Sequence, residues 1–369
     1  MRRAATIQLD PDALRHNLGV ARRLAPETPM WSVIKAEGYG HGLLWAAEAL
    51  AGSSDGLAVS CLEEARALRR AGFDGRVLLL HGPRDAAGVR ACVEFGLQPV
   101  VHAASQLEHL EATGVSVPCL WIKLNTGMNR LGFLPEQAAT VRARIAAAGH
   151  GRDGIHWMTH MACADEPRHP QNSLQLRRFA AATAEQPGAR SVANSAALFA
   201  GWGRGGEAGG AGDYWARPGI MLYGAHPAAT PDAESPEGPE ADLRPAMTVR
   251  APIIATQALE PGSSVGYGAT WTATTQGRAG IVAMGYADGY PRHAPSGTPV
   301  RVHGQRCPLI GRVSMDMLAV DLSAVPAAVV GDMVTLWGEG LPVERVARAA
   351  GTISYELLTR VADRLQPAH

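Results

Sequence analysis

The stretch WSVIKA, residues 31–36, is a short apolar run that contains a lysine near its end, and it is the first of eight such runs. Alanine-rich segments with helical patterns separate the runs from one another. Regular alternation of short apolar runs with helical segments is typical of a parallel β-sheet covered by helices. The eight runs are WSVIKA (31–36), GLAVS (56–60), RVLLLHG (76–82), LQPVVH (97–102), CLWIKLN (119–125), IHWMTHM (155–161), ARSVANS (189–195) and WARPGIMLYG (215–224).

The number of runs favours a closed barrel over an open, doubly wound sheet. Eight strand and helix pairs within residues 31–224 match the smaller end of the size range of (β/α)8 barrels. One intervening helix carries clear signals: Ser60 followed three residues later by Glu63 predicts a capping box, and Gly72 predicts the helix end. We therefore predict an N-terminal (β/α)8 barrel over residues 11–235.

The character of the sequence changes after the eighth run. Residues 226–247 are rich in proline, alanine and acidic side chains without periodicity, which indicates a linker or surface loop. β-type runs follow with no regular helices between them, and two helical segments close the chain. We predict a second, mostly antiparallel β domain over residues 241–369, joined by residues 1–10. Its β-type runs are TVRAPIIATQAL (248–259), RAGIVAMG (278–285), TPVRVHG (298–304), CPLIGRV (307–313), MLAVDLS (317–323) and DMVTLWG (332–338).

Composition excludes several classes of function. The chain has 369 residues and zero net charge, so no basic surface is predicted for nucleic acid or anionic membranes. Its five cysteines lie far apart without a C-x-x-C pair, so we predict neither a disulfide framework nor a metal site. The N-terminus has no apolar run of signal-peptide length, and no stretch is long enough to span a membrane. We expect a cytoplasmic protein that acts on a small molecule.

Only two of the 34 basic residues are lysines, Lys35 and Lys123. A guanidinium group stays protonated in proteins and cannot serve as a nucleophilic amine or a proton acceptor. A lysine can do both when burial or a neighbouring cation lowers its pKa. Either these two lysines remain by chance in an arginine-rich chain, or they are candidates for amine chemistry.

The polar residues of the barrel runs gather where a barrel places its chemistry, at the carboxyl ends of the strands. Ser195 starts a predicted helix after the seventh run, and Arg217 precedes Pro-Gly in the eighth, where such barrels commonly bind a phosphate. Ser195 alone is equally a simple helix N-cap. A phosphate site, a strand-end lysine and a nearby arginine together are what pyridoxal phosphate requires. The strand-end residues are Lys35, Lys123, Asn125, His160, Asn194, Ser195 and Arg217.

Eight separated motifs resemble the alanine racemases, in the same order along the chain, from about residue 6 to residue 361. The resemblance implies a pyridoxal phosphate enzyme with an N-terminal barrel and a C-terminal β domain. It also implies a head-to-tail homodimer whose active sites are built from both chains. The motifs are VIKAEGYGHG (33–42), KLNTGMNRLGF (123–133), MTHMACADE (158–166), ANSAA (193–197), RPGIMLYG (217–224), VGYGATW (265–271), GYADGYPR (285–292) and GRVSMDM (311–317).

The resemblance assigns roles to particular residues. Lys35 would hold the cofactor through an imine and act as one catalytic base, and Tyr267 of the partner subunit would be the opposing base. Two bases on opposite faces of Cα accomplish racemisation directly. A phenol has an ordinary pKa near 10, so such a base needs activation by its surroundings. The implied cofactor contacts are Lys35, Tyr39, His160, Asn194, Ser195, Arg217, Gly219, Ile220 and Tyr355.

The remaining implied residues concern the substrate. Arg130 and Met315 would bind the substrate carboxylate, the latter from the partner chain. The implied supporting residues are Lys123, which some family members carry as a carbamate, Tyr286 at the entrance, and Asp316. Several positions depart from the family pattern: Ser314 stands where cysteine is common, Glu37 and Gly38 replace Asn-Ala, and Asn125 replaces aspartate.

The expected activity is the interconversion of L- and D-alanine, because Tyr286 and Tyr355 at a narrow entrance favour a small side chain. Such an enzyme would provide D-alanine as a peptidoglycan precursor or serve alanine breakdown. A serine racemase or one of broad specificity is the alternative. A non-catalytic pyridoxal phosphate carrier is disfavoured by the retained Tyr267 and Arg130. A decarboxylase of the same general fold would be expected to show a catalytic cysteine in the β domain, and neither Cys307 nor Ser314 meets that expectation.

Overall fold

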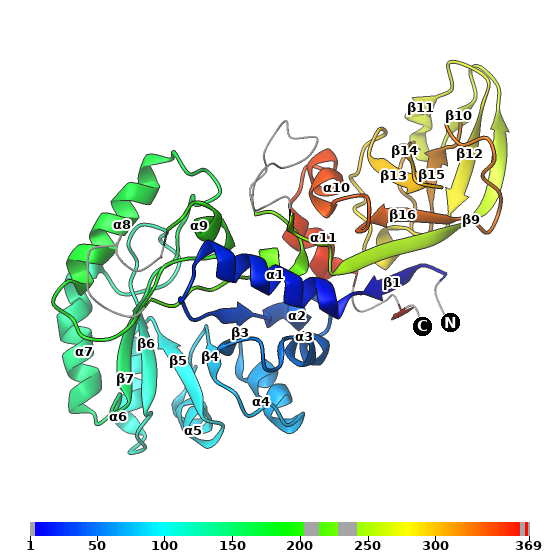
Figure 1. Cartoon of the computed structure of the whole chain (residues 1–369). Coiled ribbons are helices and arrows are strands. Elements are labelled where there is room, and N and C mark those ends of the chain that lie inside the picture. The colour runs from blue at the N-terminus through cyan, green and yellow to red at the C-terminus, as the bar shows by residue number, and fades with distance from the viewer. Residues whose placement is uncertain (1–3, 203–213, 228–241, 362–365, 368–369) are drawn as a thin grey trace.

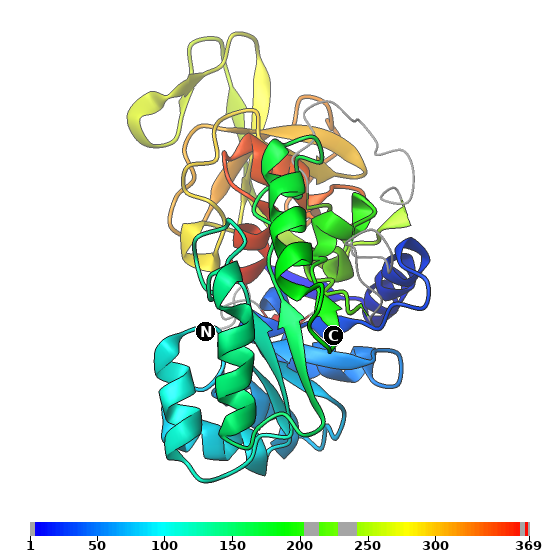
Figure 2. The same ribbon diagram turned by 90° about the vertical axis from the view of Figure 1, so that its left-hand side faces the viewer.

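The computed structural model describes residues 4–202, 214–227, 242–361 and 366–367 (Figure 1). Most of the predicted linker, residues 228–241, and the glycine-rich segment 203–213 lie outside the described residues. The remaining chain forms an N-terminal parallel sheet wrapped by helices and a C-terminal antiparallel β domain, as Figure 1 shows from one side and Figure 2 from another. The predicted fold class is confirmed.

Seven of the eight predicted runs form one curled parallel sheet, in which each strand pairs with the next along the chain. The strands are β2 (Trp31–Val33), β3 (Gly56–Val59), β4 (Val77–Leu79), β5 (Leu97–Val101), β6 (Cys119–Lys123), β7 (Gly154–Met158) and β8 (Arg190–Ser191). The helices around them are α1 (Pro11–Leu24), α2 (Lys35–Gly40), α3 (Leu43–Leu50), α4 (Leu62–Arg70), α5 (Ala86–Glu94), α6 (Ala104–Ala112), α7 (Ala138–Ala147), α8 (Pro170–Thr183) and α9 (Ser195–Phe199), with the 3₁₀ turn η1 (Pro135–Gln137) before α7.

The eighth run and the residue before it close the sheet through isolated bridges. Tyr214, directly before the run, pairs with Arg190 of β8, and Ala216 pairs with Met30 before β2. Trp31 N–H donates to the Ala216 carbonyl at 2.8 Å, which completes the ring of strands. The run is extended only as far as Pro218. Ile220–Tyr223 form the 3₁₀ turn η2, so the prediction of a strand through residue 224 is wrong there, because a proline has no N–H to continue a ladder.

The capping box of α4 lies one residue later than predicted. Its N-cap is Cys61, and the glutamate at the third helical position is Glu64, whose carboxylate accepts from Ser60 N–H at 2.6 Å and from Cys61 N–H at 3.4 Å. Glu63 points outward and is exposed. A shift of one residue rotates a helix by about 100°, so the choice of glutamate decides which side chain faces the barrel.

The β domain is a closed antiparallel barrel built around one long strand. β9 (Met247–Leu259) pairs with β16 in its first half and with β12 in its second, and the order β12-β15-β14-β13-β16-β9 returns to β12. β1 (Thr6–Leu9) adds to the free side of β9, so the N-terminal strand lies in this sheet. The other elements are β10 (Ser264–Val265), η4 (Tyr267–Ala269), β11 (Trp271–Thr272), β12 (Gly277–Val282), η5 (Tyr286–Asp288), β13 (Pro299–Val302), β14 (Gln305–Ile310), β15 (Leu318–Asp321), β16 (Met333–Trp337), α10 (Val343–Ala349), α11 (Ser354–Arg360) and β17 (Gln366–Pro367).

Helix α11 joins the two parts of the molecule. It packs against α2, which follows the first barrel strand, and the contact is close because Gly40 has no side chain. A β-carbon on Gly40 would lie 2.1 Å from the carbonyl oxygen of Leu358. The C-terminal domain therefore places one of its own helices beside the carboxyl end of β2.

Three tryptophans fill the opposite, amino-terminal side of the barrel. Trp31 stacks on Trp215 with ring centroids 4.6 Å apart, and both meet Trp121 edge to face. Trp31 and Trp121 are buried. Gly56 lies against this cluster, since a β-carbon there would come within 2.3 Å of the Trp31 ring. The cluster makes this end of the barrel a packed core rather than an opening.

Candidate active site

A cavity of about 710 Å³ lies at the carboxyl ends of the barrel strands, under α11. It collects eleven of the residues singled out from the sequence. The same cavity is also lined by Val33, Ala36, Leu80, His81, Leu131, Met158, Ile353, Glu356 and Thr359. The eleven predicted residues that it brings together are Lys35, Tyr39, Lys123, Arg130, His160, Asn194, Ser195, Arg217, Gly219, Ile220 and Tyr355.

Lys35 stands at the start of an unusual backbone turn. Residues 36–39 all have φ between 52° and 57°, so the chain makes one left-handed helical turn directly after the lysine. L-residues rarely adopt this conformation in succession, and surrounding contacts must hold it. His41 is one such contact, because its Nδ1–H donates to the carbonyls of Gly38 and Tyr39, both at 3.1 Å. Glu64 Oε1 is another and accepts from Ala36 N–H at 2.7 Å.

The electrostatic surroundings of Lys35 favour a neutral amine. Burial and, secondly, the nearby Arg130 lower the pKa of Lys35, while Glu64 opposes the change. Lys123, at the end of β6, is affected similarly: burial, then Arg217 and Arg130, lower its pKa to about 8. For both lysines the pKa is shifted in the direction that amine chemistry near neutral pH requires.

Hydroxyl and backbone N–H groups gather at one end of the cavity. Ser195 Oγ accepts from Gly219 N–H at 2.9 Å and from Met221 N–H at 3.4 Å, which leaves its own proton for a further acceptor. A β-carbon on Gly219 would lie 2.6 Å from the Tyr39 hydroxyl oxygen, so that position must stay bare. Asn194 caps α9 through Ala197 N–H, so Asn194 rather than Ser195 is the N-cap.

The tyrosines at this end keep their protons. Burial raises the pKa of Tyr39 well above its ordinary value. The negative charge that Tyr355 would carry if ionised is the second cause of this shift. Burial, followed by Asp165, raises the pKa of Tyr355 to about 12. Two protonated phenols can therefore donate hydrogen bonds to an anion held between them and the serine.

Arg217 is buried, and within the described residues its hydrogen bonds go to carbonyl and hydroxyl oxygens rather than to a carboxylate. Its Nη2 donates to the carbonyls of Thr159 at 2.6 Å and Val192 at 3.3 Å, and Nη1 donates to Ser191 Oγ. Burial lowers the pKa of Arg217 to about 10, so the guanidinium remains charged at neutral pH. His160 Nδ1 lies 3.5 Å from Nη2.

His160 itself is neutral. Burial, followed by the field of Arg217 and then of Lys123, lowers its pKa well below the ordinary value. The ring can pack against a ligand as an uncharged surface. Apart from Glu356, which pairs with Arg360 at 2.7 Å, the residues that line the cavity carry no carboxylate. An excess of cations indicates that the ligand is an anion.

Arg130 is held by a short loop rather than by a strand. Asn125 Oδ1 accepts from Gly127 N–H at 3.2 Å and from Asn129 N–H at 2.9 Å, and its amide donates to Asn129 Oδ1 at 3.1 Å. Gln171 reaches across from α8 to the Gly127 carbonyl at 2.9 Å. Loop residues 125–130 are therefore fixed around one amide side chain, with Arg130 at their end.

Four predicted residues do not line the cavity. Tyr267 lies between β10 and β11, which Figures 1 and 2 both place at the end of the β domain away from the barrel, and its side chain is 69% exposed. Tyr286 and Met315 are 40% and 54% exposed. Asp316 follows Met315 directly.

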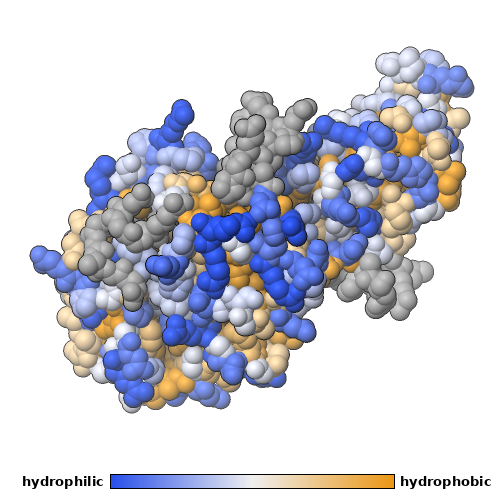
Figure 3. All heavy atoms as spheres, in the orientation of Figure 1, coloured by the Kyte–Doolittle hydropathy of each residue, from blue (hydrophilic) through white to orange (hydrophobic). Residues whose placement is uncertain are grey.

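These four residues nevertheless belong to one continuous surface. Tyr286 N–H donates to the Ser314 carbonyl at 3.1 Å, and Ala287 N–H donates to the Met315 carbonyl at 2.9 Å. The turn of Tyr267 rests on Arg312, two residues before Ser314, since a β-carbon on Gly268 would lie 3.1 Å from the Arg312 guanidinium. Apolar patches are visible on this end of the β domain in Figure 3. The chain thus presents its predicted site residues in two separate groups.

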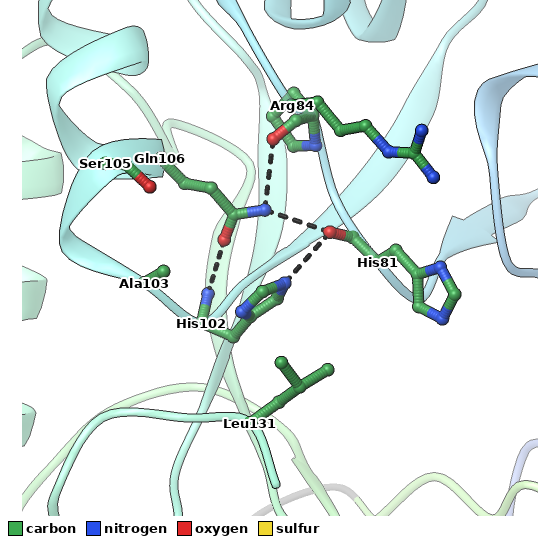
Figure 4. Close-up of a pocket in the computed structure, with 8 residues that line it drawn as sticks. His81, Arg84, His102, Ala103, Ser105, Gln106 and Leu131 are labelled. Atoms are coloured by element: carbon green, nitrogen blue, oxygen red, sulfur yellow. Dashed lines mark hydrogen bonds between the residues drawn. The ribbon is translucent and has the colours of Figure 1, made fainter.

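Sequence reasoning missed several cavity residues, of which His81 carries the clearest signal. It lies near the end of the third run, two residues after β4, at a strand end like the lysines, and the same rule would have found it. His81 and Leu131 also line a neighbouring pocket of about 450 Å³, shown in Figure 4. There Gln106 donates to the His81 carbonyl at 2.9 Å and accepts from His102 N–H at 2.8 Å. These bonds fix the ends of β4 and β5 beside the cavity.

The fold and the site define a two-domain barrel enzyme with a low-pKa amine at the barrel mouth and cations that face an anionic ligand. Models of two domain families match nearly the whole chain: "Alanine racemase, N-terminal domain" over residues 9–227 and "Alanine racemase, C-terminal domain" over residues 246–369. The chain belongs to the alanine racemase family.

Individual relatives agree with this assignment. An alanine racemase of Thioalkalivibrio sulfidiphilus is 52% identical over 99% of both chains, and one of Marinobacter nauticus is 50% identical over 100% of both. The crystal structure of the biosynthetic alanine racemase from Pseudomonas aeruginosa aligns with a TM-score of 0.89, at 44% identity, over 100% of this chain and 99% of that one. An alanine racemase from Bartonella henselae with covalently bound pyridoxal phosphate aligns with a TM-score of 0.83, at 25% identity, over 99% of both chains.

Within the described residues, no helix is both long and apolar enough to cross a membrane. In the same part of the chain, no group of three or more His, Cys, Asp or Glu side chains is arranged to hold a metal ion.

Proposed function

We propose that this protein interconverts L- and D-alanine with pyridoxal phosphate bound in the barrel cavity. Two bases would act on opposite faces of the substrate, Lys35 of one chain and Tyr267 of a second copy. The observation that carries the proposal is the single cavity that joins a low-pKa amine, a buried arginine and a cluster of hydroxyl and N–H donors. The family membership supports the same conclusion.

The cavity residues fit pyridoxal phosphate. Ser195, Tyr39 and Tyr355 offer hydroxyl donors and Ile220 offers a backbone N–H, all suited to a phosphate, and Gly219 leaves room for it because it has no side chain. Lys35 offers the amine that would join the aldehyde, and Arg217 offers a donor to the ring nitrogen. When bound, pyridoxal phosphate supplies an electron-withdrawing ring that makes the Cα proton of an attached amino acid removable.

The chain's own groups would then hold the substrate and move its proton. Arg130 is the cation placed to bind the substrate carboxylate, and Asn125 keeps its loop in position. The Lys35 amine accepts the proton from Cα on its own side, which its lowered pKa favours. Arg217 does not give up its proton, so it acts as a fixed donor. Neutral His160 adds an uncharged wall.

Tyr267 does not reach the cavity of its own chain, because it lies on the far hairpin of the β domain, so in the proposed mechanism it would come from a second copy. A head-to-tail arrangement of two copies would bring the surface of Tyr267, Tyr286, Met315 and Asp316 over the partner's barrel mouth. Tyr267 would then return a proton to the face opposite Lys35. Each dimer would hold two complete sites, each built from two chains.

Subunit mixing tests this arrangement. Lys35→Ala and Tyr267→Phe are each expected to lower racemisation of L-alanine by at least a thousandfold. After the two inactive variants are dissociated and reassociated in equal amounts, half of the dimers are mixed, and each mixed dimer has one intact site. About a quarter of the parent activity should therefore return.

The same experiment separates the competing functions. If both bases came from one chain, mixing would restore nothing. Racemisation followed in D2O should show Cα deuterium entering together with inversion; exchange without inversion would contradict the two-base scheme, and no reaction would favour a non-catalytic carrier. Faster turnover of L-serine than of L-alanine would favour the alternative of a serine or broad-specificity racemase.

The biological setting follows from the activity and is part of the same proposal. We place the protein in the cytoplasm, where it would provide D-alanine as a peptidoglycan precursor or act in alanine breakdown. Its five cysteines are unpaired, which suits a reducing compartment.

A further inference from the structure

Lys35 stands at the point where the chain leaves the barrel sheet. The last sheet bond is made by Ile34 N–H, which donates to the Ala58 carbonyl at 2.9 Å. Beyond it the left-handed turn begins, and the N–H of Ala36 no longer points along a neighbouring strand. A peptide in this conformation stays in place only if another group accepts its N–H.

That acceptor is Glu64, from the next barrel helix. Its carboxylate bridges three backbone N–H groups: Ala36 at 2.7 Å through Oε1, and Ser60 at 2.6 Å and Cys61 at 3.4 Å through Oε2. One oxygen therefore serves the lysine turn while the other caps α4. The bridge ties the peptide that follows Lys35 to the end of β3, and it uses a charge-assisted hydrogen bond.

Glu64 also differs in sign from Arg130, the other charged group whose field acts on Lys35. Besides burial, Lys35 in turn lowers the pKa values of His81, Lys123 and His160, so the amine lies among basic groups. Glu64 is the carboxylate whose field favours the protonated lysine.

We propose that Glu64 is a positioning residue for Lys35: its carboxylate fixes the peptide that follows the lysine and places a negative charge beside the amine. The role deepens the proposed function and rests on it for the part that Lys35 plays in catalysis. It goes beyond helix capping, since a cap alone would have no effect on the amine.

The chain allows a direct test because it contains only two lysines. Full-length protein from which any bound pyridoxal phosphate has been removed, labelled with ¹³C at lysine Cε, should give two lysine signals whose pH titration reports each amine. Lys35→Arg and Lys123→Arg assign them. In Glu64→Gln, which keeps the shape and removes the charge, the pKa of Lys35 should fall by about half a pH unit or more. The Lys123 signal serves as an internal reference and should move less.

Glu63→Gln is the matched control, because Glu63 is the neighbouring glutamate on the same helix and is exposed. It should leave the Lys35 titration unchanged. The positional part of the proposal is tested by Glu64→Ala in the enzyme loaded with pyridoxal phosphate, where kcat should fall about tenfold while KM stays within about twofold. A thermal unfolding curve confirms that each variant is folded.

The outcomes are distinguishable. An unchanged Lys35 titration in Glu64→Gln would overturn the proposal, as would an equal response to Glu63→Gln. If the parent protein fails to racemise alanine but the Lys35 titration still moves, the proposed function fails while the assignment of Glu64 stands.

Discussion

Gly40 shows that the site depends on one position that has no side chain. Its φ of +83° is uncommon for other residues, and a β-carbon there would lie 2.1 Å from the Leu358 carbonyl oxygen in α11. The same helix carries Tyr355 into the cavity. The position therefore links the lysine turn to the C-terminal domain.

We expect Gly40→Ala to destabilise the protein by about 2 kcal/mol or more, because both the backbone conformation and the helix contact are lost. Affinity for pyridoxal phosphate should also fall, since Tyr355 shifts with α11. Urea unfolding and a cofactor titration measure the two effects. Gly262→Ala is a suitable comparison, because its φ is also positive, at +90°, but nothing lies within 4 Å of the added carbon. Equal losses in both variants would show that the α11 contact contributes nothing.

His41 gives the protein a predictable sensitivity to acid. Burial lowers its pKa to about 4, although its bonds to the Tyr39 and Gly38 carbonyls oppose the change. In the unfolded chain the ring binds a proton near pH 6.5, whereas in the folded chain it does so only near pH 4. The unfolded state thus binds more protons between these values. The stabilisation is complete above about pH 6.5 and is lost as the pH falls toward 4, by up to about 1.4 kcal/mol per pH unit.

Replacing this ring should therefore flatten the pH dependence of stability. In His41→Gln, the difference in the free energy of unfolding between pH 7 and pH 5 should be smaller than in the parent, while stability at pH 7 is also lower because the left-handed turn loses its donor. Urea midpoints at the two pH values provide the measurement. His293→Gln removes an exposed histidine and should retain the parent's slope. A parent-like slope in His41→Gln would mean that other buried histidines, such as His160, account for it.

At the scale of elements, the loop of residues 125–130 shows how an irregular segment can be as well defined as a strand. Asn125 alone satisfies two backbone N–H groups of this loop. In Asn125→Ala these donors lose their acceptor, so Arg130 should become less well placed for the substrate carboxylate. We expect KM for alanine to rise about tenfold, with a smaller change in kcat.

Steady-state kinetics of Asn125→Ala and Asn125→Asp check this expectation. The aspartate keeps an oxygen in the same place and should hold KM within about threefold of the parent value. An unchanged KM in the alanine variant would show that Arg130 is positioned by other contacts, such as that of Gln171 with the Gly127 carbonyl.

Elements of this size also show what the sequence could and could not predict. The seven barrel strands are apolar runs bounded by turn signals, so their existence and order were predictable. Their carboxyl ends bring Lys35, Lys123 and His160 to one cavity, and the eighth run adds Arg217. The left-handed turn was not predictable, because it depends on acceptors and donors from elsewhere, Glu64 and His41. The capping box of α4 was placed one residue early for a related reason: Glu63 and Glu64 both suit a helix start, and only the tertiary contact with Ala36 selects the second.

At the scale of the whole molecule, the separation of Tyr267 from the cavity means that the proposed two-base activity would depend on association. If each site needs two chains, the specific activity should fall when the protein is diluted below the dissociation constant of the dimer. Initial rates measured over several decades of protein concentration, beside sedimentation at the same concentrations, test this. Rates that stay proportional to concentration after the protein has become monomeric would contradict the two-chain site.

The sequence places the second group of predicted site residues, Tyr267, Tyr286, Met315 and Asp316, in the β domain. It does not show that this group lies far from the barrel mouth of the same chain. Motifs in linear order carry no information on which chain completes a site; that came from the resemblance alone. The structure adds that Tyr286 and Met315 are joined by backbone bonds between their segments, and that Tyr267 stands on an adjoining turn. One continuous face holds the whole group, which is the condition for a single partner to receive it.

The packed tryptophans on the amino-terminal side of the barrel have a kinetic consequence. Because Trp31, Trp121 and Trp215 fill that side, a small molecule that reaches Lys35 from the mouth must also leave through the mouth. Reactant and mirror-image product then share one route and exclude each other from it. Accumulating product should slow the forward reaction by occupying the route, well before the two enantiomers reach equal amounts.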